Sequence, residues 1–229
     1  SDSYETTNAD QGSGWEGGPA GEVRTLAETD AALVRLVEVL EEEEAAEVFK
    51  IVETGFSALN EASMMKQDMT WEEVLADATN PTVKKVILYD GVEDGSYRPI
   101  GYVNFLTDVD QVPWLNIGAS KRLAGLEPEA DTYCVSTLVI EPSARLLQSA
   151  QFLLGAVGGW LGGIADERAR EGRQFGVLFD HAPKNKALPR LIRSAIRAAD
   201  PQLEVHKVGR EDTLLVDTEV AAPLVDQAA

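Results

Sequence analysis

Segments with two different hydrophobic periods alternate along the chain, which predicts both strands and helices. Short runs rich in β-branched and aromatic residues predict strands. These runs are 22–27, 83–89, 100–106, 133–140, 175–179, 203–208 and 213–220. Two Asp-Gly pairs, at 90–91 and 94–95, favour a turn after the second run. We therefore expect 100–106 to pair antiparallel with 83–89.

Apolar residues at helical spacing predict helices between the first two strands. A first helix is expected from Ala31, with Thr29 or Asp30 as its cap. Its core face would consist of Leu33, Val37 and Leu40. A second helix is expected through 48–59. The run of glutamates at 41–44 is interpreted as a solvated face or a corner between two helices.

Three further segments have recognisable local signals. Thr70 and Glu73 form a capping box that begins a short helix, which must end before Pro81. The stretch 107–131 contains several Pro and Gly residues and predicts a long loop with one helical turn, and loops of this length are often functional. Asn185 is expected to cap a helix with apolar positions Leu188, Leu191, Ile192, Ala195, Ile196 and Ala199.

The segment 146–164 has no charged residue and approaches the length that crosses a bilayer. Gly155, Gly159 and Gly163 share one helix face, which permits close approach of another backbone. Each interior glycine costs about 1 kcal/mol against alanine, so close packing is expected to offset the loss. The segment lies between two predicted strands and contains Gln148, Ser149 and Gln151. These features favour a buried helix of a soluble protein over a membrane span.

The chain has 229 residues, which suits one large domain with appendages. Residues 1–21 are polar and are expected to form an extended N-terminal arm, followed by a single domain over 22–220 and a tail over 221–229. An arm of this composition would be disordered alone. We expect it to be held against a neighbouring chain, by self-association or in a larger assembly.

Charge and composition limit the possible partners. The net charge of −19 opposes binding to nucleic acid, which relies on clustered Lys and Arg. One cysteine, Cys134, and two histidines make a disulfide or a metal centre unexpected. No apolar stretch follows a basic start, so no signal peptide is predicted and the cytoplasm is the expected location.

The predicted order of strands and helices resembles that of the GNAT superfamily of acyl-coenzyme A-dependent N-acyltransferases. The family motif is Arg or Gln, two residues, Gly, one residue, then Gly or Ala. It follows a strand and holds the coenzyme A pyrophosphate at a helix start. Here Arg145 matches the first position, Ala150 matches the last, and Gln148 replaces the central Gly. The resemblance implies an α/β (α+β) fold with a mixed, mostly antiparallel sheet flanked by helices.

The same resemblance implies the site. Arg145, Gln148, Ser149 and Ala150 would frame the pyrophosphate of acetyl-CoA or another acyl-CoA, and Asn185 matches the Asn that often begins a later helix of the family. The tyrosine that commonly protonates the departing thiolate is absent, because no tyrosine follows Tyr133. The resemblance covers about 22–220 in element order.

Acyl transfer to an amine needs a base and donors for the developing oxyanion. Glu141 and His181 end adjacent predicted strands, and either is a candidate base, although strand ends are commonly polar without a catalytic role. Trp114 and Tyr133 are candidates for substrate binding. Tyr133 is also a candidate for the acid that would replace the missing tyrosine and protonate the departing thiolate. Both residues are equally consistent with ordinary packing. Cys134 is expected to be a small buried residue.

Two functions remain open at this point. The first is an N-acyltransferase working by direct attack on the acyl-CoA, with a small-molecule or protein amine as acceptor. The acidic surface would favour a cationic acceptor. The second is a catalytically inactive structural or assembly protein with the same fold, such as a component of a virion or another large particle. The substitution of Gly by Gln148, the missing tyrosine and the polar arm favour the second.

Overall fold

A computed structural model describes residues 21–61, 69–91, 95–108, 117–123, 125–142, 146–181, 190, 192–194, 203–211 and 216–223. The chain forms two compact units. The first consists of Ser1–Phe105 and Thr137–Leu153, and the second of Leu106–Ser136 and Leu154–Ala229. Arg145, Trp114, Asn185 and the predicted arm lie outside the described residues.

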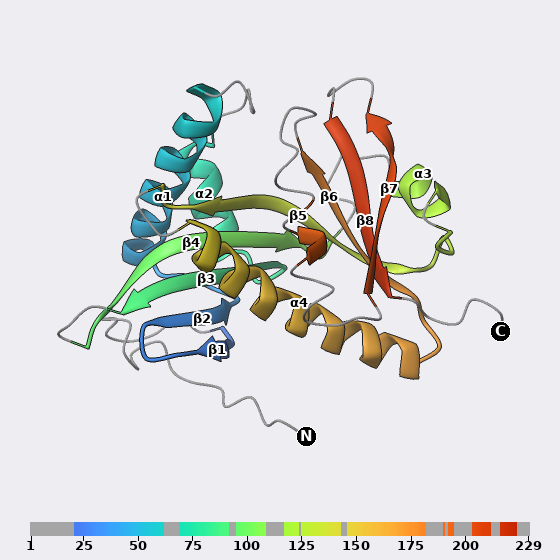
Figure 1. The fold of residues 1–229 in the computed structure, drawn as a ribbon, viewed down its shortest axis with the longest axis horizontal. Helices are drawn as coiled ribbons and strands as arrows, with labels where there is room; N and C mark the ends of the chain where they lie inside the picture. Colours follow the sequence, from blue (N-terminus) through green and yellow to red (C-terminus); the bar gives the residue numbers. More distant parts are fainter. Residues whose placement is uncertain are drawn as a thin grey trace. The chain divides into compact units, whose positions relative to one another are not determined.

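The first unit is built on a sheet in the order β1-β2-β3-β4-β5 (Figure 1). The strands are β1 (Val23–Glu28), β2 (Ala32–Val37), β3 (Val83–Gly91), β4 (Tyr97–Leu106) and β5 (Asp131–Ile140). β2 is antiparallel to both β1 and β3. β3 and β4 are neighbours joined by a connection too short for a parallel crossover, which confirms the predicted hairpin.

The helix predicted from Ala31 is wrong, because this segment is strand β2. Thr29 does act as a cap, but of a hairpin turn: the amides of Ala31 and Ala32 donate to its Oγ1 at 3.3 and 3.1 Å. The amide of Thr29 donates to the carbonyl of Ala32 at 2.8 Å and closes the turn. β2 is buried along most of its length, and a strand buried on both faces has no alternation to distinguish it from a helix.

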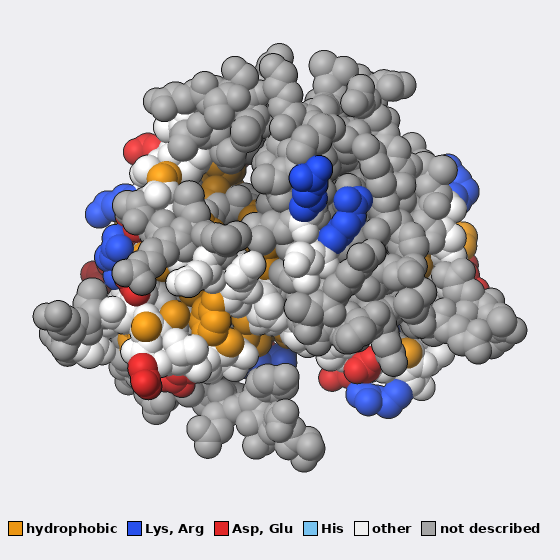
Figure 2. All heavy atoms as spheres, viewed as in Figure 1, with side chains coloured by type: hydrophobic (Ala, Val, Ile, Leu, Met, Phe, Trp, Pro, Cys, Tyr) orange, Lys and Arg blue, Asp and Glu red, His pale blue; other side chains and the backbone are white. Residues whose placement is uncertain are grey.

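Helices α1 (Glu42–Glu61) and α2 (Trp71–Thr79) follow β2 and pack with the sheet through one apolar cluster. Thr70 accepts from the amide of Glu73 at 3.2 Å, as the capping box predicts. The buried members of the cluster are Val23, Leu33, Val37, Leu40, Ala45, Val48, Ile51, Val52, Phe56, Val74, Ala78, Ile87, Tyr89, Tyr102 and Val139. Figure 2 shows hydrophobic side chains over β2 and β3, with charged side chains in separate groups around them.

The second unit contains the first half of β5 with β6 (Phe175–His181), β8 (Val216–Pro223) and β7 (Leu203–Glu211), in that order. β5 and β6 are parallel, whereas β8 is antiparallel to both β6 and β7. α3 (Ile117–Leu123) contacts β7 and β8 and is the helical turn predicted within the long loop. The predicted strands are confirmed, and the mixed sheet confirms the fold class.

α4 (Leu146–Arg170) begins in the first unit and ends in the second. In the second unit, Nε of Arg168 donates to Asp131 at 2.8 Å, which fixes the last turn of α4 to the start of β5. The hydrogen bond from this guanidinium to Asp131 raises the pKa of Arg168. No helix in the described part of the chain combines the length and apolarity that a membrane crossing requires.

The glycines of α4 differ from the glycine of α1 in their surroundings. A Cβ atom added at Gly155, Gly159 or Gly163 would meet nothing within 4 Å, so the close packing expected along this face is absent. A Cβ atom at Gly55 of α1 would lie 3.2 Å from Cβ and Cγ1 of Val139 on β5. Of these four helix glycines, Gly55 is therefore the one that makes the close approach that a missing side chain allows.

Two buried ionisable side chains lie beneath α1 and α2. Glu44 is 1 % exposed, so its place in the predicted solvated face is wrong. The hydroxyl of Tyr89 donates to Oε1 of Glu44, and Oε2 has no hydrogen-bond partner among the described residues. Burial raises the pKa of Glu44 to about 8, despite the opposing hydrogen bond from Tyr89. Glu44 is therefore protonated at neutral pH.

Lys85 of β3 is the second buried group. Its Nζ donates to the carbonyls of Asp77 and Asn80 at 2.7 and 2.9 Å, and so caps the last turn of α2. Nδ2 of Asn104 donates to Oδ2 of Asp77 at 3.0 Å. Burial lowers the pKa of Lys85 to about 7 and raises that of Asp77. β3 thus fixes α1 through Tyr89 and α2 through Lys85.

Replacing Gly159 by Ala is expected to raise the free energy of unfolding by about 1 kcal/mol, because the helix gains propensity and the new methyl group meets nothing. Gly55→Ala gains the same propensity, but its methyl group must displace Val139, and overpacking costs roughly 1–3 kcal/mol. Urea unfolding followed by circular dichroism measures both variants. Equal gains at the two positions would contradict the contact at Gly55.

Replacing Glu44 by Gln is expected to stabilise the protein increasingly as the pH rises. The folded-state pKa is raised from 4.5 to about 8, so the unfolded state binds fewer protons between these values. Wild-type stability should therefore fall across this window by roughly 1.4 kcal/mol per pH unit relative to Glu44→Gln. Urea unfolding at pH 5 and pH 9 measures the difference. Exposed Glu53→Gln on the same helix is the control. A gain from Glu44→Gln that is equal at both pH values would refute the raised pKa of Glu44.

Candidate functional site

The candidate site in the first unit is the turn between β5 and α4. β5 ends at Ile140 and α4 begins at Leu146. The amide of Glu141 donates to the carbonyl of Ile100 at 2.7 Å, so the backbone stays attached to β4 one residue past the end of the strand. This bond sets the direction in which the chain leaves the sheet toward α4.

Glu141 is paired with an arginine that the sequence analysis did not identify. Nη1 of Arg98, on β4, donates to both carboxylate oxygens of Glu141, at 2.9 and 3.2 Å. Glu141 is half-buried, and the side chain of Arg98 is 52 % exposed. The two residues are distant in the chain, and nothing in the local pattern indicated that the strands would bring them together.

The first turn of α4 presents three of the predicted cofactor-binding residues. Gln148 is exposed, Ser149 is half-buried and Ala150 is 6 % exposed. The first amides of a helix have no intrahelical acceptor, so they are available to an external group. This turn contains no acidic residue, unlike the first turns of α1 and α2. The arrangement suits an anion.

Tyr133 and Cys134 lie in the second unit, where β5 pairs with β6. The register runs from Asp131 opposite Phe175 to Cys134 opposite Leu178. The ring of Tyr133 lies 5.1 Å from that of Phe175 and 6.0 Å from that of Trp160, in an aromatic cluster. Tyr133 is 8 % exposed, and Cys134 is fully buried as expected. Tyr133 therefore packs in the core of this unit.

His181 is the last residue of β6 and lies opposite Asp217 of β8. The structure thus brings Glu141, Gln148, Ser149 and Ala150 together in the first unit, whereas Tyr133 and His181 belong to the second. In the described part of the chain, no group of three or more His, Cys, Asp or Glu residues is arranged to hold a metal ion.

No family model matches this chain, and no curated protein matches it. Among solved structures, it is similar to a GNAT-family acetyltransferase from Listeria monocytogenes 4b F2365, with 11% identity and a TM-score of 0.51 over 83% of this chain and 94% of that one.

Two other structures match less closely. The ribosomal L7/L12 alpha-N-protein acetyltransferase RimL has 10% identity and a TM-score of 0.48, over 90% of this chain and 97% of that one. Arabidopsis thaliana NAA60, in complex with a bisubstrate analogue, has 12% identity and a TM-score of 0.48, over 83% of this chain and 98% of that one. At such identities the likeness concerns the fold alone. The chain has the fold of the GNAT superfamily.

Proposed function

We propose that this protein is an acyl-CoA-dependent N-acyltransferase that transfers an acyl group to an amine by direct attack. The observation that carries the proposal is the start of α4. This turn directly follows a central strand of a GNAT fold, and it is free of the acidic residues that begin α1 and α2. Its amides are therefore available to a phosphate group.

The described residues of this turn fit a bound pyrophosphate. Ala150 places no large side chain at the last position of the motif, and Ser149 adds a hydroxyl donor on a half-buried position. Gln148 is exposed, and in this proposal its side chain turns outward so that a phosphate reaches the amides. We assign Arg145 and Asn185 to the same cofactor site by their positions in the sequence.

The reaction requires a proton acceptor for the incoming amine. We assign this role to Glu141 or His181. Bound acyl-CoA supplies the activated acyl group. In this reaction the amine nitrogen would bond to the acyl carbon, the carbon–sulfur bond would break, and the thiolate would take up a proton from solvent, because Tyr133 packs in the core of the second unit. Trp114 is assigned to the acceptor side.

Arg98 has a positioning role in this proposal. It donates to both oxygens of Glu141 and thereby fixes the carboxylate at the end of β5. Each carboxylate oxygen has two acceptor sites, so the pair leaves acceptor capacity for a water molecule or an amine. The positive charge of Arg98 also reduces the repulsion between Glu141 and a nearby phosphate.

Replacing Gln148 by Glu is expected to weaken binding of acetyl-CoA by about tenfold, because the new charge repels phosphate at the helix start. The same charge stabilises the free helix, so weaker binding would not reflect loss of fold. Gln151→Glu, also exposed on α4, is the matched control and should bind nearly as the wild type does. Isothermal titration calorimetry measures all three proteins, and Arg145→Ala should also weaken binding.

Absence of acetyl-CoA binding by the wild-type protein, in calorimetry and in thermal-shift measurements, would overturn the proposal. The inactive assembly protein would then be the better description, and determination of the particle size in solution would test it. If acetyl-CoA binds, release of free thiol in the presence of an amine measures transfer. Binding without thiol release for small amines and peptides would also contradict an enzyme.

A further inference from the structure

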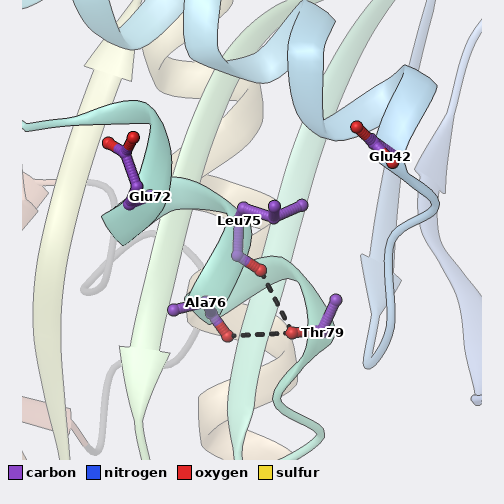
Figure 3. A pocket seen from close by; sticks show the side chains of 5 residues that line it. All are labelled: Glu42, Glu72, Leu75, Ala76 and Thr79. Atoms are coloured by element: carbon purple, nitrogen blue, oxygen red, sulfur yellow. Dashed lines mark hydrogen bonds between the residues drawn. The ribbon is translucent and has the colours of Figure 1, made fainter.

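An open groove lies between the first turn of α1 and one face of α2 in the first unit. Its volume is about 500 Å³, and it is lined by Glu42, Glu72, Leu75, Ala76 and Thr79. Figure 3 shows Glu42 and Glu72 on opposite sides of the groove, with Leu75 between them. The groove shares no residue with the acyl-transfer site, which uses the end of β5 and the start of α4.

The floor of the groove is apolar. The hydroxyl of Thr79 donates back to the carbonyls of Leu75 and Ala76, at 3.1 and 3.3 Å, so its polar group is satisfied within α2 (Figure 3). Ala76 is exposed, and Leu75 packs against the core cluster while remaining partly exposed. A ligand in this groove therefore meets hydrocarbon along the floor and a carboxylate on either side.

The two carboxylates have no basic partner among the residues that the structure describes. Neither Glu42 nor Glu72 is in any ion pair of the described residues, and Lys50 is the only basic residue in the sequences of α1 and α2. Among the described residues, the two lysines that follow α2 in the sequence are engaged elsewhere, Lys84 with Glu38 and Lys85 with the end of α2. The groove therefore attracts positive charge.

We propose that this groove binds a lysine-bearing segment of a partner protein. The aliphatic stem of lysine lies along an apolar surface while its ammonium group reaches an acidic side chain, which matches the floor and sides of the groove. A second copy of this chain, with its net charge of −19, is electrostatically disfavoured, and nucleic acid is repelled for the same reason. This proposal for the groove does not depend on the acyl-transfer proposal.

The test is an NMR titration of the full chain with a capped peptide, Lys-Leu-Lys-Leu-Lys, at low salt and without coenzyme A. The amide signals of Leu75, Ala76 and Thr79 are expected to shift, and added salt should weaken the binding. The same peptide with Glu in place of Lys should leave these signals unchanged. Absence of shifts with the lysine peptide, or equal shifts with both peptides, would overturn the proposal.

Variants separate the groove from the general acidity of the chain. Glu42→Gln with Glu72→Gln is expected to weaken peptide binding by about fivefold, as two exposed ion pairs are lost. Glu47→Gln with Glu53→Gln removes the same charge from exposed positions of α1 outside the groove and should change binding much less. Ala76→Arg places a base in the groove and should abolish the shifts.

Equal weakening by the two double variants would show that only the overall charge attracts the peptide and would overturn the groove as a site. Retained binding of the lysine peptide by Ala76→Arg would also overturn the groove as its binding site. None of these outcomes bears on acyl transfer, because acetyl-CoA binding is measured separately on the wild-type protein. Failure of one proposal is therefore distinguishable from failure of the other.

Discussion

The parallel pairing of β5 with β6 is the constraint from which the position of the candidate site follows. The registers of β1 with β2, β2 with β3, β6 with β8 and β7 with β8 are antiparallel, and such neighbours can be joined by short turns. A parallel pair needs a crossover, and α4 is that crossover. The first turn of α4 must therefore follow the end of β5, whatever the loop sequence. The helix start that the acyl-CoA proposal uses is thus placed at the end of β5 by topology.

β3 has a comparable role for the helices of the first unit. Its Tyr89 reaches Glu44 in the first turn of α1, and its Lys85 reaches the carbonyls at the end of α2. The amide of Leu40, just before α1, donates to the carbonyl of Ala78 in α2 at 2.8 Å. These contacts connect the start of α1 with the end of α2, which are the two walls of the groove. Buried polar groups that cost desolvation energy thus determine the shape of an exposed surface.

The sequence predicted those elements that have a clear local signal. The α2 capping box, the hairpin strands and the long uncharged helix were confirmed because each depends on neighbouring residues. β2 was mistaken for a helix because Thr29 caps turns of either kind, and because a strand buried on both faces shows no alternation. Glu44 and Arg98 were missed for a different reason. The burial of one and the pairing of the other arise from contacts with strands far along the chain.

The distribution of charge at helix starts bears on both proposals. Acidic residues in the first turn offset the positive end of the helix dipole, and α1 has exposed Glu42 and Glu43 there while α2 has Glu72 and Glu73. The first turn of α4 has none, and neither has that of α3 in the second unit. The carboxylate just before it, Glu141, is paired with Arg98. In the first unit, the start of α4 therefore suits the anion that the acyl-CoA proposal requires, while the exposed carboxylates of Glu42 and Glu72 suit the cation that the groove proposal requires.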